Sequence, residues 1–178
     1  ILAGKKIFCH STDDNHNGSP DDSPACDSYG GFTMIMPEEF TYDSIYSAME
    51  QGEMYSSMGP LFKEVSVEDG KLALDITNLG TLNYAVQIYA EDVIKLEKDR
   101  EYRVRFEISC TENRMVEVML QQNGGSYQCY SWKKVELTPG TQALDYSFTM
   151  DSVTDDNVKL VFNCGTQGKA LPEHTIYL

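Results

Sequence analysis

This sequence of 178 residues has few basic side chains, no long apolar run and no closely spaced pair of cysteines. Its 14 Lys and Arg face 28 Asp and Glu, which gives a net charge of −14. That balance argues against nucleic acid and anionic membranes as partners, because both require clustered basic residues. No apolar stretch approaches the roughly 18 residues that span a bilayer. Without a CxxC pair, a zinc site is not expected.

The five cysteines fall into two groups. Cys9 and Cys26 flank a polar loop, and they either form a disulfide in an oxidising compartment or stay reduced. Cys110 and Cys164 occupy inward positions of expected strands, where we expect buried, small apolar residues. The odd number leaves at least one thiol without a partner inside the monomer.

Residues 1–60 differ in character from the rest of the chain. They carry more than half of the net negative charge, are interrupted by Gly and Pro, and lack sustained periodicity. Within them we expect a strand at Phe32–Ile35 and a short helix that opens at Pro37 and runs through Met49. We interpret residues 1–60 as an acidic, loop-rich segment packed on or covering a domain formed by residues 61–178.

Apolar and polar residues alternate between Gly70 and Gly165, which indicates strands with one face in a core. Short sequences that favour turns, such as Asn123–Gly125 and Thr138–Gly140, separate these strands, and no crossover helix fits between them. We therefore predict an all-β fold, an antiparallel two-sheet sandwich. The expected strands are residues 71–76, 84–89, 102–108, 115–121, 128–132, 144–150 and 158–164.

The segment GKLALDITNLGTLNYAVQIYAEDVIKLEKDREYRVRFEIS resembles the central part of the carbohydrate-binding modules of families 4, 9, 16 and 22. RMVEVMLQQ, YSFTMDSVTDDNVKLVFNCG and HTIYL resemble the rest of that pattern, so the resemblance covers about residues 64–178. The chain departs from it at Tyr84, where the family often has Trp, at Asp99, where it often has Gly, and throughout residues 1–60. The resemblance implies a β-jelly roll that binds plant polysaccharide in a cleft on its concave sheet.

A sugar presents hydroxyl groups at its edge and an apolar C–H face, so its binder needs aromatic rings together with amides, carboxylates or Arg. Outward positions of the expected strands supply both kinds of side chain, and the family resemblance adds Tyr84. For each candidate the alternative is an ordinary structural role, and Trp132 is either a stacking platform or part of the core. The candidates are Tyr84, Gln87, Tyr89, Arg105, Glu117, Gln121, Gln128, Tyr130 and Trp132.

The N-terminal segment also carries oxygen ligands at alternate positions, in a pattern like the start of a calcium loop. The ligands would be Asp13, Asn15, Asn17 and Asp21. Pro24 stands where an EF-hand has its bidentate Glu, so a full EF-hand is excluded. Either a looser structural calcium site or a solvated acidic loop is left, and no other cofactor is expected.

The sequence as a whole favours a secreted, monomeric, non-catalytic module that binds β-glucan, xyloglucan or xylan and targets an attached glycoside hydrolase. One alternative is a structural or adhesive domain that contacts another protein. A second is a jelly-roll hydrolase or lyase, for which Glu107 and Glu117 form the obvious carboxylate pair. No nucleophile elbow, P-loop or dinucleotide fingerprint occurs.

Overall fold

The computed structural model describes residues 31–57, 59–89 and 93–178. The chain divides into two compact units, residues 1–59 and residues 60–178. No helix in the described residues is long and apolar enough to cross a membrane. The predicted calcium ligands and the Cys9–Cys26 pair lie outside the described residues.

The described part of the first unit consists of two strands and one helix. Strand β1 (Phe32–Ile35) pairs antiparallel with β2 (Met54–Ser57), and helix α1 (Tyr42–Gln51) lies between them in sequence. Both predicted elements are confirmed, although the helix begins at Tyr42 rather than at Pro37. It begins at Tyr42 because the Thr41 side chain accepts a hydrogen bond from the backbone N–H of Ser44 and so acts as the N-cap.

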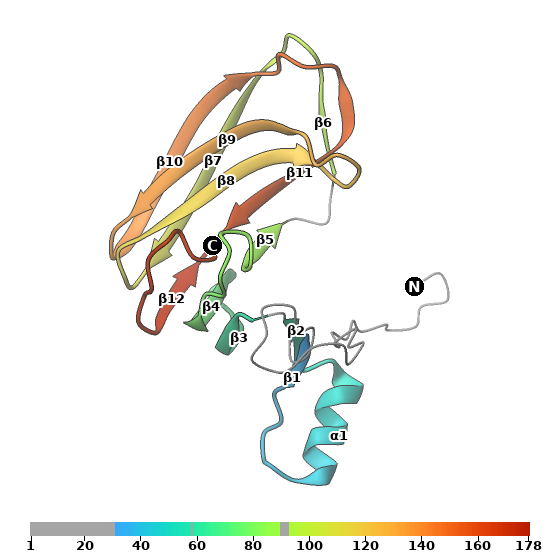
Figure 1. Cartoon of the computed structure of the whole chain (residues 1–178), viewed down its shortest axis with the longest axis vertical. Helices are drawn as coiled ribbons and strands as arrows, with labels where there is room; N and C mark the ends of the chain where they lie inside the picture. Colours follow the sequence, from blue (N-terminus) through green and yellow to red (C-terminus); the bar gives the residue numbers. More distant parts are fainter. Residues whose placement is uncertain (1–30, 58, 90–92) are drawn as a thin grey trace, which may run out of the picture. The chain divides into compact units, whose positions relative to one another are not determined.

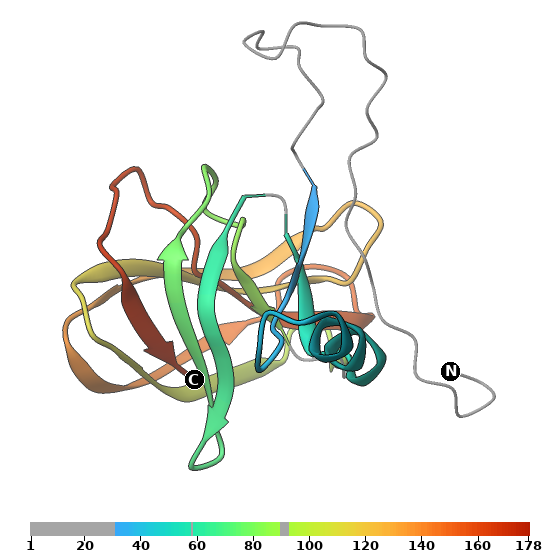
Figure 2. The same cartoon turned by 90° about the horizontal axis from the view of Figure 1, so that it is seen from below.

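The second unit is a sandwich of two antiparallel sheets (Figure 1). One sheet has the strand order β10–β7–β12–β4–β3, and the other has the order β5–β11–β8–β9 with β6 paired to β11. Figure 2 shows β3 and β4 side by side at the edge of the first sheet. The predicted antiparallel sandwich of jelly-roll type is confirmed. Its strands are β3 (Leu61–Glu68), β4 (Lys71–Asn78), β5 (Gln87–Tyr89), β6 (Ile94–Leu96), β7 (Glu101–Cys110), β8 (Arg114–Gln122), β9 (Cys129–Leu137), β10 (Gly140–Thr149), β11 (Asp155–Asn163) and β12 (His174–Tyr177).

Inward side chains of the two sheets form the core, which contains two clusters of buried residues. Phe106 and Leu160 pack against both clusters and so join them. The ring of Phe106 meets that of Phe162 edge to face, with 5.0 Å between centroids. Cys110 and Cys164 are buried and reduced, as predicted, and burial raises the pKa of Cys164 to about 11.

Strand β5 is shorter than the sequence predicted. We expected a strand over residues 84–89, but only Gln87–Tyr89 pairs with β11, and residues 84–86 belong to the preceding loop. Because Tyr84 lies in that loop, strand alternation does not require its side chain to point the same way as that of Val86, which is buried. The inward orientation of Val86 therefore does not fix the direction of the Tyr84 side chain.

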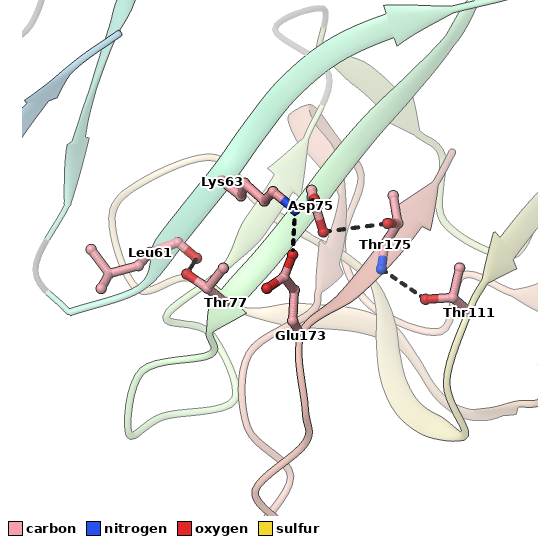
Figure 3. Close-up of polar contacts among 7 residues, drawn as sticks. All are labelled: Leu61, Lys63, Asp75, Thr77, Thr111, Glu173 and Thr175. Carbon is pink, nitrogen blue, oxygen red and sulfur yellow. Dashed lines mark hydrogen bonds and ion pairs between the residues drawn. The ribbon is translucent and has the colours of Figure 1, made fainter. Parts of the chain in front are cut away.

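The outer side of β3, β4 and β12 is joined by polar contacts (Figure 3). Lys63 Nζ donates to Glu173 Oε1 at 2.9 Å and lies 3.9 Å from Asp75 Oδ2. The Thr175 hydroxyl donates to Asp75 at 3.4 Å, and its backbone N–H donates to the Thr111 hydroxyl at 2.9 Å. Exposed ion pairs of this kind add little stability, so we read this surface as an ordinary solvated face.

A buried arginine ties the start of β8 to the segment that follows β11. Arg114 Nη1 donates to His174 Nε2 at 2.6 Å, and Nη2 donates to the Cys164 carbonyl. Arg114 therefore anchors the segment that follows β11. The Nε2 atom can accept only in neutral His174, and its Nδ1–H then donates to the Pro172 carbonyl at 2.7 Å.

The segment fixed by Arg114 in turn holds the loop before β5. The backbone N–H of Cys164 donates to Val86 O at 2.7 Å, and that of Gly165 donates to Asn83 O at 2.9 Å. A Cβ at Gly165 would lie 2.2 Å from Leu82 O, so only glycine permits this approach. Arg114 thereby fixes the loop on which Asn83 and Tyr84 lie.

We expect the stability of the protein to fall through His174 as the pH drops below about 6.5. Burial, with the Arg114 cation beside the ring, lowers the pKa of His174. The unfolded chain then binds more protons in this range, so the stability is complete above the ordinary histidine pKa and is lost as the pH falls below it. The slope is at most about 1.4 kcal/mol per pH unit. Urea unfolding across this range should show a flatter dependence for His174→Gln, and equal slopes would contradict the assignment.

Candidate functional site

The outer face of the sheet β5–β11–β8–β9 carries an open groove of about 800 Å³. The pairing register arranges its side chains into rows that cross the strands. The central row, which we call the apolar row, consists of Tyr89, Val161, Met119 and Trp132. It crosses four strands, which at about 4.8 Å between strands corresponds to about 14 Å.

Polar rows lie on both sides of the apolar row, because side chains two residues apart on a strand share a face. The row that we call the amide row consists of Gln87, Asn163, Glu117 and Lys134. The row on the other side, which we call the open row, consists of Lys159 and Gln121. The groove thus has an apolar stripe with hydrogen-bonding groups along both edges.

The rings of the groove are exposed, whereas its polar floor is buried. Tyr84, Tyr89, Tyr127 and Trp132 are each between 54% and 59% exposed. Glu117, Gln121, Lys159 and Asn163 are buried. Rings left in water beside a fixed polar floor are what a ligand with both hydroxyl groups and apolar faces requires.

The amide row is a closed hydrogen-bond network centred on Glu117. Asn83 Nδ2 donates to Glu117 Oε2 at 2.6 Å, and Asn163 Nδ2 donates to the same atom at 3.3 Å. Lys134 Nζ lies 4.0 Å from Glu117 Oε1, and Gln87 Nε2 donates to Asn163 Oδ1 at 2.9 Å. These bonds hold the buried side chains of Glu117 and Asn163 in one orientation.

The open row differs from the amide row in its contacts. Lys159 Nζ lies 4.7 Å from the ring centroid of Tyr89 and 5.7 Å from that of Tyr127. Tyr127 stands in the turn between β8 and β9 with a φ of 53°, a conformation that is costly for a large side chain. The cation thus lies against two exposed rings at the open side of the groove.

The structure brings six of the nine candidate residues together at the groove. These are Tyr84, Gln87, Tyr89, Glu117, Gln121 and Trp132. The loop before β5 supplies Tyr84, and the outward positions of β5, β8 and β9 supply the others. Arg105, Gln128 and Tyr130 do not line the groove.

Arg105 lies on the other sheet, which corrects its predicted placement. It stands on β7, exposed, opposite Asp145 of β10. Although β7 and β8 follow each other in the chain, the connection between them passes from one sheet to the other. Alternation shows which face of a strand is outward, but it does not show in which sheet the strand lies.

A β-bulge removes Tyr130 from the groove face. Leu120 pairs with Ser131 but Gln121 pairs with Cys129, so Tyr130 is the extra residue in β9. Its ring packs against the core, and its hydroxyl donates to Asp155 at 2.6 Å. This hydrogen bond raises the pKa of Tyr130 to about 12. Gln128, just before the bulge, donates to the Ser152 hydroxyl instead.

The sequence candidates missed five residues that line the groove. They are Asn83, Met119, Tyr127, Lys159 and Asn163. Met119, Lys159 and Asn163 occupy outward positions of predicted strands, so the signal was present in the alternation. Asn83 and Tyr127 come from loops, for which the sequence has no periodic signal.

The structure separates the carboxylates that a hydrolase would need. Glu107 is exposed on β7 and Glu117 is buried on β8, in the other sheet. Both Glu117 oxygens already contact protein groups. In the part of the chain that the structure describes, no group of three His, Cys, Asp or Glu side chains is placed to hold a metal ion.

Stability measurements can separate the groove ring from the core ring of β9. Trp132→Ala should change the free energy of unfolding by less than about 0.5 kcal/mol, because the ring is more than half exposed. Tyr130→Ala should cost about 2 kcal/mol, because it removes core packing and the bond to Asp155. Urea denaturation of both variants measures the difference. Equal losses would contradict the bulge at Tyr130.

Comparisons with known proteins agree with this architecture. The chain is 31% identical over 121 residues to a cellulose 1,4-beta-cellobiosidase of Acetivibrio thermocellus. That match covers 65% of this chain but 13% of the enzyme, so the chain spans only a small part of its relative.

Solved structures with low sequence identity share the fold. A structure described as "CBM4 structure and function" has a TM-score of 0.57 at 22% identity, over 66% of this chain and 73% of the other. The N-terminal cellulose-binding domain of Cellulomonas fimi β-1,4-glucanase C has a TM-score of 0.51 at 18% identity, over 64% and 76%. The second such domain of that enzyme has a TM-score of 0.53 at 17% identity, over 65% and 76%.

The family model described as "Carbohydrate binding domain", which covers carbohydrate-binding modules of families 4 and 9, matches residues 57–172. This range is most of the chain, and it includes every residue that lines the groove. A carbohydrate-binding role follows from that match. The chain belongs to this family of carbohydrate-binding domains.

Proposed function

We propose that the groove binds a β-linked plant cell-wall polysaccharide, namely β-glucan, xyloglucan or xylan, and that the module directs an attached glycoside hydrolase to it. The observation that carries this proposal is the apolar row with polar rows on both sides. Sugar rings with equatorial substituents have apolar faces and a hydroxyl-bearing edge. A chain of such rings laid along the apolar row would contact Tyr89 and Trp132 with its faces and both polar rows with its hydroxyls.

The amide row, in which Glu117 and Asn163 are buried, supports selectivity in this proposal. Gln87, Asn163 and Glu117 are held by one another, so the groups that point to the ligand are ordered before it binds. Pre-ordered groups lose little conformational entropy on binding, which favours affinity for a ligand with matching hydroxyls. The match to part of a cellobiosidase supports attachment to a catalytic domain and secretion as further parts of the proposal.

The two alternatives are less well supported. A hydrolase would need two carboxylates at one cleft, but Glu107 and Glu117 lie on different sheets. A protein-contact domain is less well supported, because buried amide and carboxylate groups beside exposed rings suit a ligand rich in hydroxyl groups.

We expect Trp132→Ala and Tyr89→Ala each to weaken binding to the preferred polysaccharide at least about tenfold, because one stacked aromatic ring is lost. Affinity electrophoresis and calorimetry against soluble β-glucan, xyloglucan and xylan measure this. Tyr46→Ala in helix α1 is a matched control, because Tyr46 is as exposed as Tyr89 but is not part of the groove.

The same samples test the alternatives. Retention on a polysaccharide without new reducing ends supports the binding module. Release of reducing sugar would support a hydrolase, and absence of retention on every glycan would contradict the proposal in favour of a protein contact.

Calcium binding by Asp13, Asn15, Asn17 and Asp21 stays a prediction from the sequence. If these oxygen ligands bind the ion in the folded chain, calcium should raise the melting temperature and a chelator should reverse the rise. Asp13→Asn combined with Asp21→Asn should remove the response. A melting temperature that does not change with either addition would exclude the site.

A further inference from the structure

The open row contains a buried cation that no carboxylate neutralises in the described part of the chain. Lys159 is 9% exposed, and its recorded partners are the rings of Tyr89 and Tyr127. The side-chain amide of neighbouring Gln121, also buried, donates to no other side chain among the described residues. Both groups line the groove, so two hydrogen-bond donors side by side are free to meet a ligand.

The groove's other charges offset each other. Glu117 Oε2 accepts bonds from Asn83 and Asn163, and the Lys134 ammonium group lies 4.0 Å from Oε1, so the Glu117 charge has a cation beside it. Lys159 therefore supplies the uncompensated charge of the described groove lining. With 9% of its surface exposed, Lys159 has lost part of the hydration of its ammonium group, and the ring contacts offset only part of that loss. A ligand that brings a negative charge to Lys159 would offset the rest.

Resting on the proposed function, we propose that the groove prefers β-linked chains that carry a uronic acid, with the sugar carboxylate against Lys159 and a hydroxyl against Gln121. The apolar row binds the sugar rings as it would in a neutral chain. The carboxylate then makes charge-assisted hydrogen bonds with the ammonium group at the side of that row. An ammonium group has three hydrogens, so the two ring contacts leave at least one for a carboxylate.

Because the protein is strongly acidic, its preference for an acidic chain can come only from short-range contacts in the groove. With a net charge of −14, the chain repels an anionic polymer at long range. Attraction at a buried lysine acts at short range and is weakly screened. The preference should therefore persist at physiological salt, of about 0.15 M, where exposed charges are largely screened.

The test compares acidic and neutral forms of the same chain. Glucuronoxylan fragments and oxidised β-1,4-glucan fragments with C6 carboxylates are each paired with the same fragments after reduction of the carboxyl groups to alcohols. Calorimetry at about 0.15 M salt should give an affinity about tenfold higher for the acidic member of at least one pair. Lys159→Met should bring the two members to within about twofold, and Lys159→Arg should keep the preference.

Lys133→Met is the matched control, because Lys133 Nζ also lies over a tyrosine ring, 4.8 Å from the Tyr146 centroid, but outside the groove. This variant should keep the full preference, and the melting temperature of each variant checks its folding. Equal affinity for acidic and neutral members, or tighter binding of the neutral ones, overturns this inference and leaves the proposed function standing. Absence of binding to both members of both pairs, and to every neutral polysaccharide, overturns the proposed function and this inference with it.

Discussion

The pairing of β8 with β11 is the constraint on which both the core and the groove depend. These two strands lie in the middle of their sheet, and most of their side chains are buried on both faces. Val118 and Phe162, paired across the strands, point into the core, while Glu117 and Asn163 on the next pair form the groove floor. A shift of one residue in this register would exchange the two faces, placing carboxylate and amide groups in the core. The energy of the core therefore fixes the geometry of the groove.

The buried arginine extends this constraint to the edge of the groove, where the loop with Asn83 and Tyr84 lies. Arg114 is the first residue of β8, and it bonds to the segment that follows β11. That segment holds the loop with Asn83 and Tyr84 through backbone hydrogen bonds and the close approach at Gly165. Part of the rim is thus positioned by buried contacts at the ends of the same two strands. The groove's loop residues are ordered by the sandwich rather than by contacts with a ligand.

Much of the fold could be predicted from the sequence, because the outward and inward positions of β7, β8, β10 and β11 alternate regularly. The same alternation placed Glu117 and Gln121 on the groove side. It failed at Tyr130, since a bulge changes the parity of a strand without a residue type that marks it. It failed at Arg105, since alternation does not say in which sheet a strand lies. Lys159 was passed over because a lysine at an outward position is typical of any solvated surface.

Replacing an exposed ring of the groove and replacing a buried residue of its floor have different effects on the free energy of unfolding. Rings that are more than half exposed add little to the free energy of unfolding, so several of them can change without a compensating mutation elsewhere. The floor residues are tied into the register of β8 and β11 and change only together. Evolution, or a library in which only the rim positions vary, can therefore produce new specificities on one scaffold while its stability stays almost constant.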